Sequence, residues 1–268
     1  MAEDWGEIFS GLLRIDNDQL TDYGEDNEDY VESMLTKEDT IAIAGLTNRL
    51  SSRTTEHPWL HQVRHTAIHH IVHTGGRFGV RKITVYAAVI YVDRLLSSMP
   101  IVVERFEVGK LLGVACLFLA AEHLEEYEDQ PDLSDYEYFV ECSARSITNM
   151  RNHVVKQFGG IVKFVTPIHF IKYFLSKFCR DFSRKEYARF ITVEIIMSIL
   201  GDVRLMSLRA FVVGAAATLL GSNPNILTEQ MIRDEINALP TNWRISLDEV
   251  CSCYNRLLET NRHRLDIN

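Results

Sequence analysis

The sequence contains no hydrophobic run long enough to cross a membrane. No window of 18 residues is entirely apolar, although 46% of the 268 residues are hydrophobic, and a membrane-spanning helix needs about 20 consecutive apolar residues. The first residues, MAEDWGEIF, are acidic, whereas a secretory signal begins with basic residues and continues with an apolar run. We therefore expect a globular protein of the nucleus or the cytoplasm, with no membrane partner and enough chain for one large core or two average ones.

Cysteine is scarce, and its spacing is not that of a metal site. The five cysteines are odd in number and lie mostly in apolar helical sequence, which is typical of reduced thiols in a protein core. Cys251 and Cys253 form a C-x-C pair, but no second pair stands at the spacing of a zinc site. The sequence thus predicts reduced cysteines and no bound metal.

Sequence patterns of catalysis are also missing. Gly75 and Gly76, like Gly159 and Gly160, are isolated pairs rather than a glycine-rich phosphate loop. The chain has no G-x-S-x-G nucleophile elbow and no H-E-x-x-H metalloprotease motif. We therefore expect a protein that is not an enzyme and that needs no cofactor.

Positive charge is nearly absent from the N-terminal part of the chain. Residues 1–40 hold 13 acidic and two basic residues, so the remaining chain holds 24 acidic and 26 basic residues. An acidic arm thus precedes a nearly neutral body without a basic stripe, which argues against a nucleic-acid partner. Apolar residues such as Val31, Met34 and Leu35 recur at helical spacing, and we expect a helix between residues 27 and 51.

Alternating strand patterns are absent, and the body of the chain is predicted to be all-α. Pro58 suits the first turn of a helix, and Gly75 with Gly76 is expected to end it. The segment 82–99 is rich in β-branched residues, but its length favours a helix. The pattern predicts five helices, at residues 58–74, 82–99, 104–122, 134–142 and 144–158.

A second group of five helices is predicted to begin after Val165. Thr166 is placed to cap the first of them and Pro167 to occupy its first position, while Ser246 and Glu249 form a capping pattern for the last. The expected helices cover residues 167–182, 184–200, 207–222, 227–237 and 246–263. We therefore divide the chain into an acidic arm (1–40), two helical domains (41–164 and 165–262) and a tail (263–268).

The stretch from Ile90 to Glu126 carries a resemblance to a known family. From Leu111 to Ala121, small residues alternate with large apolar ones and leave almost no polar face, as in a helix that other helices surround. This stretch resembles the centre of a cyclin box, and the resemblance extends from about residue 31 to residue 259. It implies two tandem five-helix cyclin folds, preceded by an N-terminal helix and the acidic arm.

Five positions are nearly universal in kinase-activating cyclin boxes, and three of them hold the family's residue here. Arg64 matches the Arg of the first helix, Asp93 the Asp of the second and Leu111 the Leu of the third. The resemblance implies a buried ion pair between Arg64 and Asp93, because pairing lets such charges tolerate burial. The alternative is two separate surface charges, which the apolar surroundings of Asp93 disfavour.

The other two positions carry reversed charges. Where the family has a Lys at the end of the third helix and a Glu in the fifth, this chain has Glu122 and Arg151. The resemblance implies that the kinase interface contains these two residues and their neighbours His123, Leu124 and Ile147. A reversed pair can bond to itself, but it offers the kinase different donors and acceptors, and each unmet buried group costs about 1–3 kcal/mol.

A second surface of the family is altered as well. The substrate-docking patch, usually Met, Leu and Trp, corresponds to Val63, Ala67 and His70, so we expect it to be degenerate. Residues 27–38 and 165–171 resemble plant D-type cyclins. Such cyclins usually carry a Leu-x-Cys-x-Glu motif for retinoblastoma-type proteins, and the nearest segment, residues 12–16, lacks the Cys and the Glu.

Five histidines stand at intervals of four residues on the first predicted helix. They are expected to form a ladder along one face. Neutral imidazoles four residues apart can share a zinc or copper ion, and protonation below about pH 6.5 would place like charges side by side. No acidic or cysteine ligand stands nearby, so we expect a polar stripe without metal. The five are His57, His61, His65, His69 and His73.

The resemblance implies a function as well as a fold. It predicts a regulatory subunit, most like a divergent plant D-type cyclin, that binds a cyclin-dependent kinase as a heterodimer and controls a G1/S-like step of the cell cycle. Cell-cycle inhibitors are the further partners that it implies. The competing hypothesis is a cyclin-fold adaptor that is uncoupled from the kinase and binds other proteins.

Overall fold

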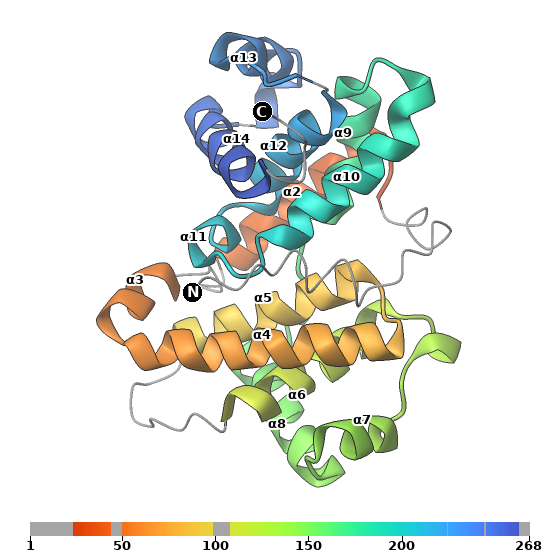
Figure 1. The fold of residues 1–268 in the computed structure, drawn as a ribbon, viewed down its shortest axis with the longest axis vertical. Coiled ribbons are helices and arrows are strands. Elements are labelled where there is room, and N and C mark those ends of the chain that lie inside the picture. Colours follow the sequence, from red (N-terminus) through yellow and green to blue (C-terminus); the bar gives the residue numbers. More distant parts are fainter. Residues whose placement is uncertain (1–23, 44–49, 99–107, 224, 244, 263–268) are drawn as a thin grey trace. The chain divides into compact units, whose positions relative to one another are not determined.

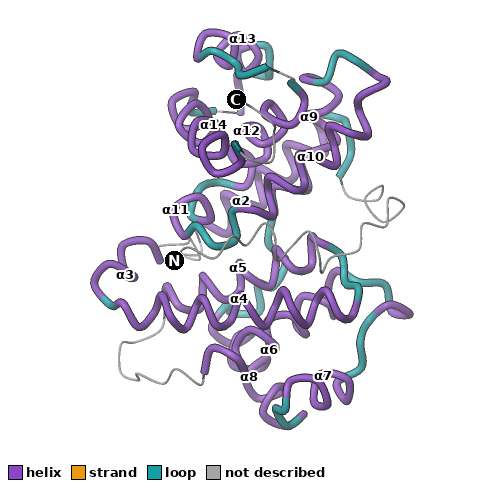
Figure 2. Tube along the Cα trace, in the orientation of Figure 1, coloured by secondary structure: helices purple, strands orange, loops and turns teal. Residues whose placement is uncertain are grey.

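The computed structural model describes residues 24–43, 50–98, 108–223, 225–243 and 245–262, and every regular element in them is helical (Figure 2). The all-α prediction is therefore confirmed. The described residues divide into two compact units. Unit 1 takes its residues from Ile41–Phe164 and Leu200–Ser207, and unit 2 takes its residues from Leu20–Thr40, Val165–Ile199 and Leu208–Asn268. None of the described helices is long and apolar enough to cross a bilayer.

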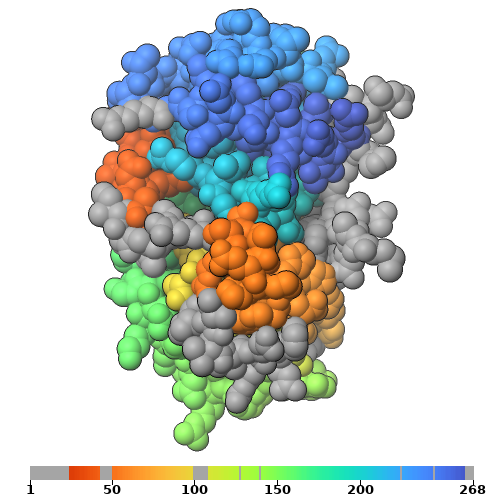
Figure 3. Space-filling model, turned by 90° about the vertical axis from the view of Figure 1, so that its left-hand side faces the viewer, coloured from red at the N-terminus to blue at the C-terminus, as the bar shows by residue number. Residues whose placement is uncertain are grey.

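Unit 1 is built around one buried helix, α6, which packs against α4, α5 and α8. All of its residues from Leu112 to Ala121 except Phe118 are buried, as the small-residue pattern predicts. Figure 3 shows the side of unit 1 that α3 and the beginning of α4 cover. The helices of this unit are α3 (Leu50–Glu56), α4 (Pro58–Phe78), α5 (Lys82–Ser98), α6 (Val108–Leu124), α7 (Leu133–Val140), α8 (Ala144–Gln157) and α11 (Val203–Met206) (Figure 1).

Two glycines let the backbones of α4 and α6 touch. A Cβ atom on Gly113 would lie 2.4 Å from the carbonyl oxygen of Ala67, and one on Gly109 would lie 2.7 Å from that of Val63. Both distances are too short for a real Cβ, so no other residue fits without moving a helix. The close approach also buries Val63 and Ala67 beneath α6.

The end of α4 differs from the prediction. The helix passes through Gly75 and Gly76 and ends at Phe78, where Gly79 adopts φ 67° and donates its N–H to the carbonyl groups of both glycines. Gly75 is buried, and a Cβ there would lie 3.0 Å from a methyl group of Val85. The predicted stop at residue 74 was wrong because Gly75 makes room for α5, whereas the glycine that ends the helix is Gly79.

Unit 2 repeats this plan around helix α12, whose residues from Ala210 to Gly221 are all buried. Helices α9, α10 and α14 pack around it. A surrounded helix of small and large apolar residues therefore forms the centre of each unit. The helices of unit 2 are α2 (Glu28–Ile43), α9 (Ile171–Phe178), α10 (Lys185–Ser198), α12 (Ala210–Ser222), α13 (Glu229–Asn237) and α14 (Leu247–Asn261).

The start of unit 2 is a short turn rather than a long helix. Thr166 precedes the 3₁₀ turn Pro167–Phe170, and the side chain of His169 accepts the Thr166 N–H at 3.1 Å. Helix α9 then ends at Phe178, four residues earlier than predicted. The segment before α12 also contains the unpredicted helix α11, whose first N–H groups are bound by Asp202.

The N-terminal helix α2 belongs to unit 2 up to Thr40. Its apolar residues Val31, Met34 and Leu35 are buried. The Glu38 carboxylate accepts the N–H of Ala210 at 2.7 Å and lies 3.3 Å from Arg209. Because no side chain of α12 itself caps its first turn, Glu38 supplies that cap from another helix. The helix expected between residues 27 and 51 is thus present, and it is a structural part of the second unit.

Candidate functional site

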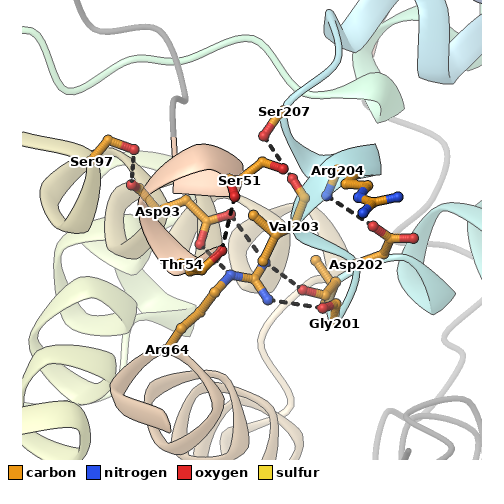
Figure 4. A network of polar contacts seen from close by, with 11 residues as sticks. Ser51, Thr54, Arg64, Asp93, Ser97, Gly201, Asp202, Val203, Arg204 and Ser207 are labelled. Atoms are coloured by element: carbon orange, nitrogen blue, oxygen red, sulfur yellow. Dashed lines mark hydrogen bonds and ion pairs between the residues drawn. The ribbon is translucent and has the colours of Figure 1, made fainter. Parts of the chain in front are cut away.

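Arg64 of α4 and Asp93 of α5 form a buried, bidentate ion pair (Figure 4). Nε of Arg64 lies 2.7 Å from Oδ1 of Asp93, and Nη2 lies 3.0 Å from Oδ2. The two residues are 2% and 0% exposed, so they are not the separate surface charges of the alternative hypothesis. Such a pair tolerates burial because each charge is matched in distance and direction.

The same guanidinium also holds a segment from much later in the chain. Nη1 and Nη2 of Arg64 donate to the carbonyl oxygens of Gly201 and Leu200, at 3.1 and 2.8 Å. The next residue, Asp202, accepts the N–H groups at the start of α11. One arginine therefore fixes α4, α5 and the beginning of α11 within unit 1, and its role is structural.

The reversed pair lies at the C-terminal end of α6 and on α8. Nε of Arg151 lies 2.8 Å from Oε2 of Glu122, and Nη1 donates to the side chain of Asn152 at 3.1 Å. The side chains of Arg151 and Glu122 remain 26% and 31% exposed. The residue at the end of α6 that faces Arg151 is therefore Glu122, and both charges are within reach of a partner.

Helix α8 is positioned by a local cap and a narrow apolar face. The hydroxyl of Ser143 accepts the N–H of Ser146 at 3.2 Å and starts the helix. Ile147 and Val154 are the buried residues of α8, and because residues four apart lie on the same side of a helix, Arg151 is carried to the edge beside α6.

The predicted neighbours of the pair divide into two groups. His123 and Leu124 are partly exposed beside Glu122. Burial lowers the pKa of His123, Arg151 and Lys163 lower it further, and Glu122 opposes them, so this imidazole is neutral at physiological pH. Ile147, by contrast, is 0% exposed. Its prediction as an interface residue is corrected, because its side chain packs inside unit 1 and cannot touch a partner.

The degenerate docking positions offer no exposed apolar side chain. Val63 and Ala67 are 2% and 0% exposed, because α6 covers them. His70 is partly exposed, and burial together with the nearby His69 and Lys110 lowers its pKa to about 4. A short peptide that needs an apolar groove therefore finds only a neutral imidazole at these positions.

The histidines at four-residue intervals do not share one face. The prediction that they form a ladder along one side of the helix is therefore corrected. Each step of four residues turns about 40° around the helix, so the series winds around α4. His61, His69 and His73 are exposed, whereas His57 and His65 are half-buried. The rings of His69 and His73 are stacked with centroids 6.2 Å apart. In the described residues, no three potential metal ligands come together.

One residue beside the site was not found from the sequence. The carboxylate of Glu125, directly after α6, is buried against the beginning of α5. It stands in a run of acidic residues whose other members at 126, 128 and 129 are exposed, and composition does not separate it from them. The signal that could have separated Glu125 from the others was its position, because it directly follows the apolar helix, three residues after Glu122.

Comparison with known proteins gives consistent similarities. The family model described as "Cyclin, N-terminal domain" matches residues 30–160. The chain is 30% identical to Cyclin-D5-1 of Arabidopsis thaliana over 244 residues, which cover 87% of this chain and 72% of that protein. It is 29% identical to Cyclin-D2-2 of Oryza sativa subsp. japonica over 240 residues, 87% and 64% of the two chains. It is 24% identical to the G2/mitotic-specific cyclin-1 of Saccharomyces cerevisiae over 136 residues, 51% and 28% of the two chains.

Proposed function

This chain belongs to the cyclin family, most like a divergent D-type cyclin, and we propose that it is the non-catalytic regulatory subunit of a cyclin-dependent protein kinase. In this role it controls progression through a G1/S-like step of the cell cycle, in the nucleus or the cytoplasm. Its similarity to D-type and mitotic cyclins favours this role over that of a kinase-uncoupled adaptor. Cell-cycle inhibitors that recognise the heterodimer are further partners under this proposal.

The proposed kinase contact is the surface formed by Glu122, His123, Leu124 and Arg151. The observation that supports the proposal is the partly exposed Glu122–Arg151 ion pair, at two positions that the resemblance to cyclins assigns to the kinase contact. The pair joins two helices of unit 1 at an accessible edge. A kinase that packs on this edge meets both charges together with the neutral imidazole of His123 and the apolar Leu124.

The reversed charges select the chemistry of the partner. Arg151 uses Nε for Glu122 and Nη1 for Asn152, so its Nη2 group is left to donate to a carbonyl or carboxylate of the kinase. Glu122 can accept an N–H of the kinase where a lysine would donate. An exposed ion pair contributes only about 0.2–1 kcal/mol, so the kinase can rearrange this pair at low cost.

Activation under this proposal is allosteric. A cyclin holds the regulatory helix of its kinase in the active position, which shifts the kinase toward its active conformation. The rigid frame for this contact is unit 1, in which the buried Arg64–Asp93 pair and the glycine contacts of α6 fix the helices.

Binding to a panel of recombinant cyclin-dependent kinases tests the proposal. We expect a 1:1 complex with one or more of them and increased phosphorylation of histone. The double change Glu122→Lys with Arg151→Glu should weaken the complex by at least about tenfold, since two or more buried hydrogen bonds are lost. The matched control is Glu126→Lys with Arg145→Glu, which makes the same charge changes at exposed neighbouring positions and should alter binding less than about twofold.

Two results would contradict the proposal. Recovery of no kinase with the wild-type chain would remove the regulatory role. A gain of kinase binding by the Glu122→Lys, Arg151→Glu variant would mean that the natural charges keep kinases away, and the adaptor hypothesis would then replace this one.

A further inference from the structure

A second carboxylate, three residues after Glu122, connects the end of α6 to a different helix. The side chain of Glu125 is 3% exposed. Its Oε1 accepts the main-chain N–H of Arg81 at 3.0 Å and the hydroxyl of Thr84, and its Oε2 lies 3.0 Å from Nε of Arg81. We infer that Glu125 is a positioning residue that fixes the end of α6 against α5, and with it the Glu122–Arg151 pair.

The partners of Glu125 are the groups at which α5 begins. Arg81 is the residue before the helix, and its carbonyl accepts the N–H groups of Thr84 and Val85. The first N–H groups of a helix have no partner within it and attract negative charge. Glu125 satisfies one of them from 44 residues away. The buried carboxylate is therefore matched by two donors and a guanidinium, as a buried charge requires.

The main chain at the end of α6 is held at the same point. The N–H of Glu125 donates to the carbonyl of Ala121 at 3.0 Å, and the side chain of Gln130 donates to the carbonyl of Glu125 at 3.1 Å. The last turn of a helix otherwise frays, because its final carbonyl groups lack partners. Glu125 and its bonds thus keep the turn that carries Glu122 helical.

The end of α6 is clamped from two sides. Glu122 holds it to α8 through a partly exposed ion pair, and Glu125 holds it to α5 through a buried one. The exposed bond is weak, so the position of Glu122 depends on the buried clamp. Sites that bind precisely need this kind of support behind the contacting residues.

Exchange of backbone amide hydrogens in the free, full-length protein tests the clamp directly. In Glu125→Ala, the amides of residues 121–125 should exchange at least about tenfold faster than in the wild type, because opening of the last turn becomes easier. The matched control is Glu126→Ala, the exposed neighbour, which should leave these rates within about twofold. Glu125→Gln keeps an acceptor oxygen for Arg81 and Thr84, so its exchange rates should lie between those of Glu125→Ala and Glu126→Ala. It also covers the case in which Glu125→Ala does not fold.

The effect on binding rests on the proposed function and is tested with a kinase that binds the wild-type chain. Glu125→Ala should weaken binding at least about fivefold alone but less than about twofold when Arg151→Ala is already present. Unchanged amide exchange, or losses that multiply fully in the double variant, would overturn the positioning role. If no kinase binds the wild type while exchange rises only in the Glu125 variants, the proposed function fails and the clamp stands.

Discussion

The Arg64–Asp93 pair predicts a large loss of stability when one member is removed. Asp93→Leu keeps much of the volume of the side chain but leaves the guanidinium of Arg64, 2% exposed, without its counter-charge. Breaking a buried ion pair in this way costs about 3–5 kcal/mol. We expect the free energy of unfolding to fall by this amount, since the carbonyl groups of Leu200 and Gly201 neutralise only part of the charge.

Replacing both members separates the pair from the rest of the network. Arg64→Met with Asp93→Leu removes both charges, and such replacements are often nearly neutral. Here the carbonyl groups of Leu200 and Gly201 lose their donor as well, at about 1–3 kcal/mol each if they stay buried and unpaired. The double variant should therefore remain less stable than the wild type, but by less than the sum of the single changes, with a coupling energy of about 2 kcal/mol.

The assay is urea unfolding followed by far-ultraviolet circular dichroism. The control is Lys110→Ala, which removes an exposed ion pair of the same unit. There the nitrogen of Lys110 lies 3.9 Å from the carboxylate of Glu141, and the side chains are 33% and 88% exposed. Its loss should cost less than about 1 kcal/mol. A cost of Asp93→Leu no greater than that of this control, or effects of Arg64→Met and Asp93→Leu that simply add, would refute the stabilising role of the pair.

Two further predictions concern packing and pH. Gly113→Ala places a Cβ 2.4 Å from the carbonyl oxygen of Ala67 and should destabilise unit 1 by about 1–3 kcal/mol, measured as a lower urea midpoint, whereas Thr66→Ala should not. Burial lowers the pKa of His169 to about 4, the main-chain carbonyl of Thr166 beside its Nδ1 opposes this, and Lys37 lowers the pKa further. Because the unfolded imidazole binds a proton more readily, unit 2 should lose stability as the pH falls from about 6.5 to 4, by up to about 3 kcal/mol. A His169→Asn variant, compared by urea unfolding at several pH values, should lose this slope, and an unchanged slope would contradict the assignment.

Local signals predicted where helices begin. Pro58 and Ser246 each stand at the predicted start of a helix, because a cap or a fixed φ angle acts within one turn of chain. The end of α4 was missed for the opposite reason. Gly75 serves a contact with Val85 on another helix, and a sequence window does not show what a glycine faces.

The candidate site was predictable only in part. The resemblance to cyclins pointed to Glu122 and Arg151, whereas their contact at 2.8 Å was established only by the structure. Ile147 was misjudged because its exposure depends on which side of α8 faces α6. Glu125 was missed because its partners, Arg81 and Thr84, come more than 40 residues earlier in the chain. Contacts of this range leave no local pattern.

The cap that Glu38 places on Ala210 has a consequence for the order of synthesis. The two residues are 172 positions apart, so at a ribosomal rate of about 5–20 residues per second α2 waits roughly ten to thirty seconds for its partner. Arg64 likewise waits for Gly201, 137 positions later. During translation both units are therefore unfinished until most of the chain has emerged, and α2 keeps its apolar face uncovered in the meantime. A nascent chain stalled before residue 200 should be a good client for chaperones.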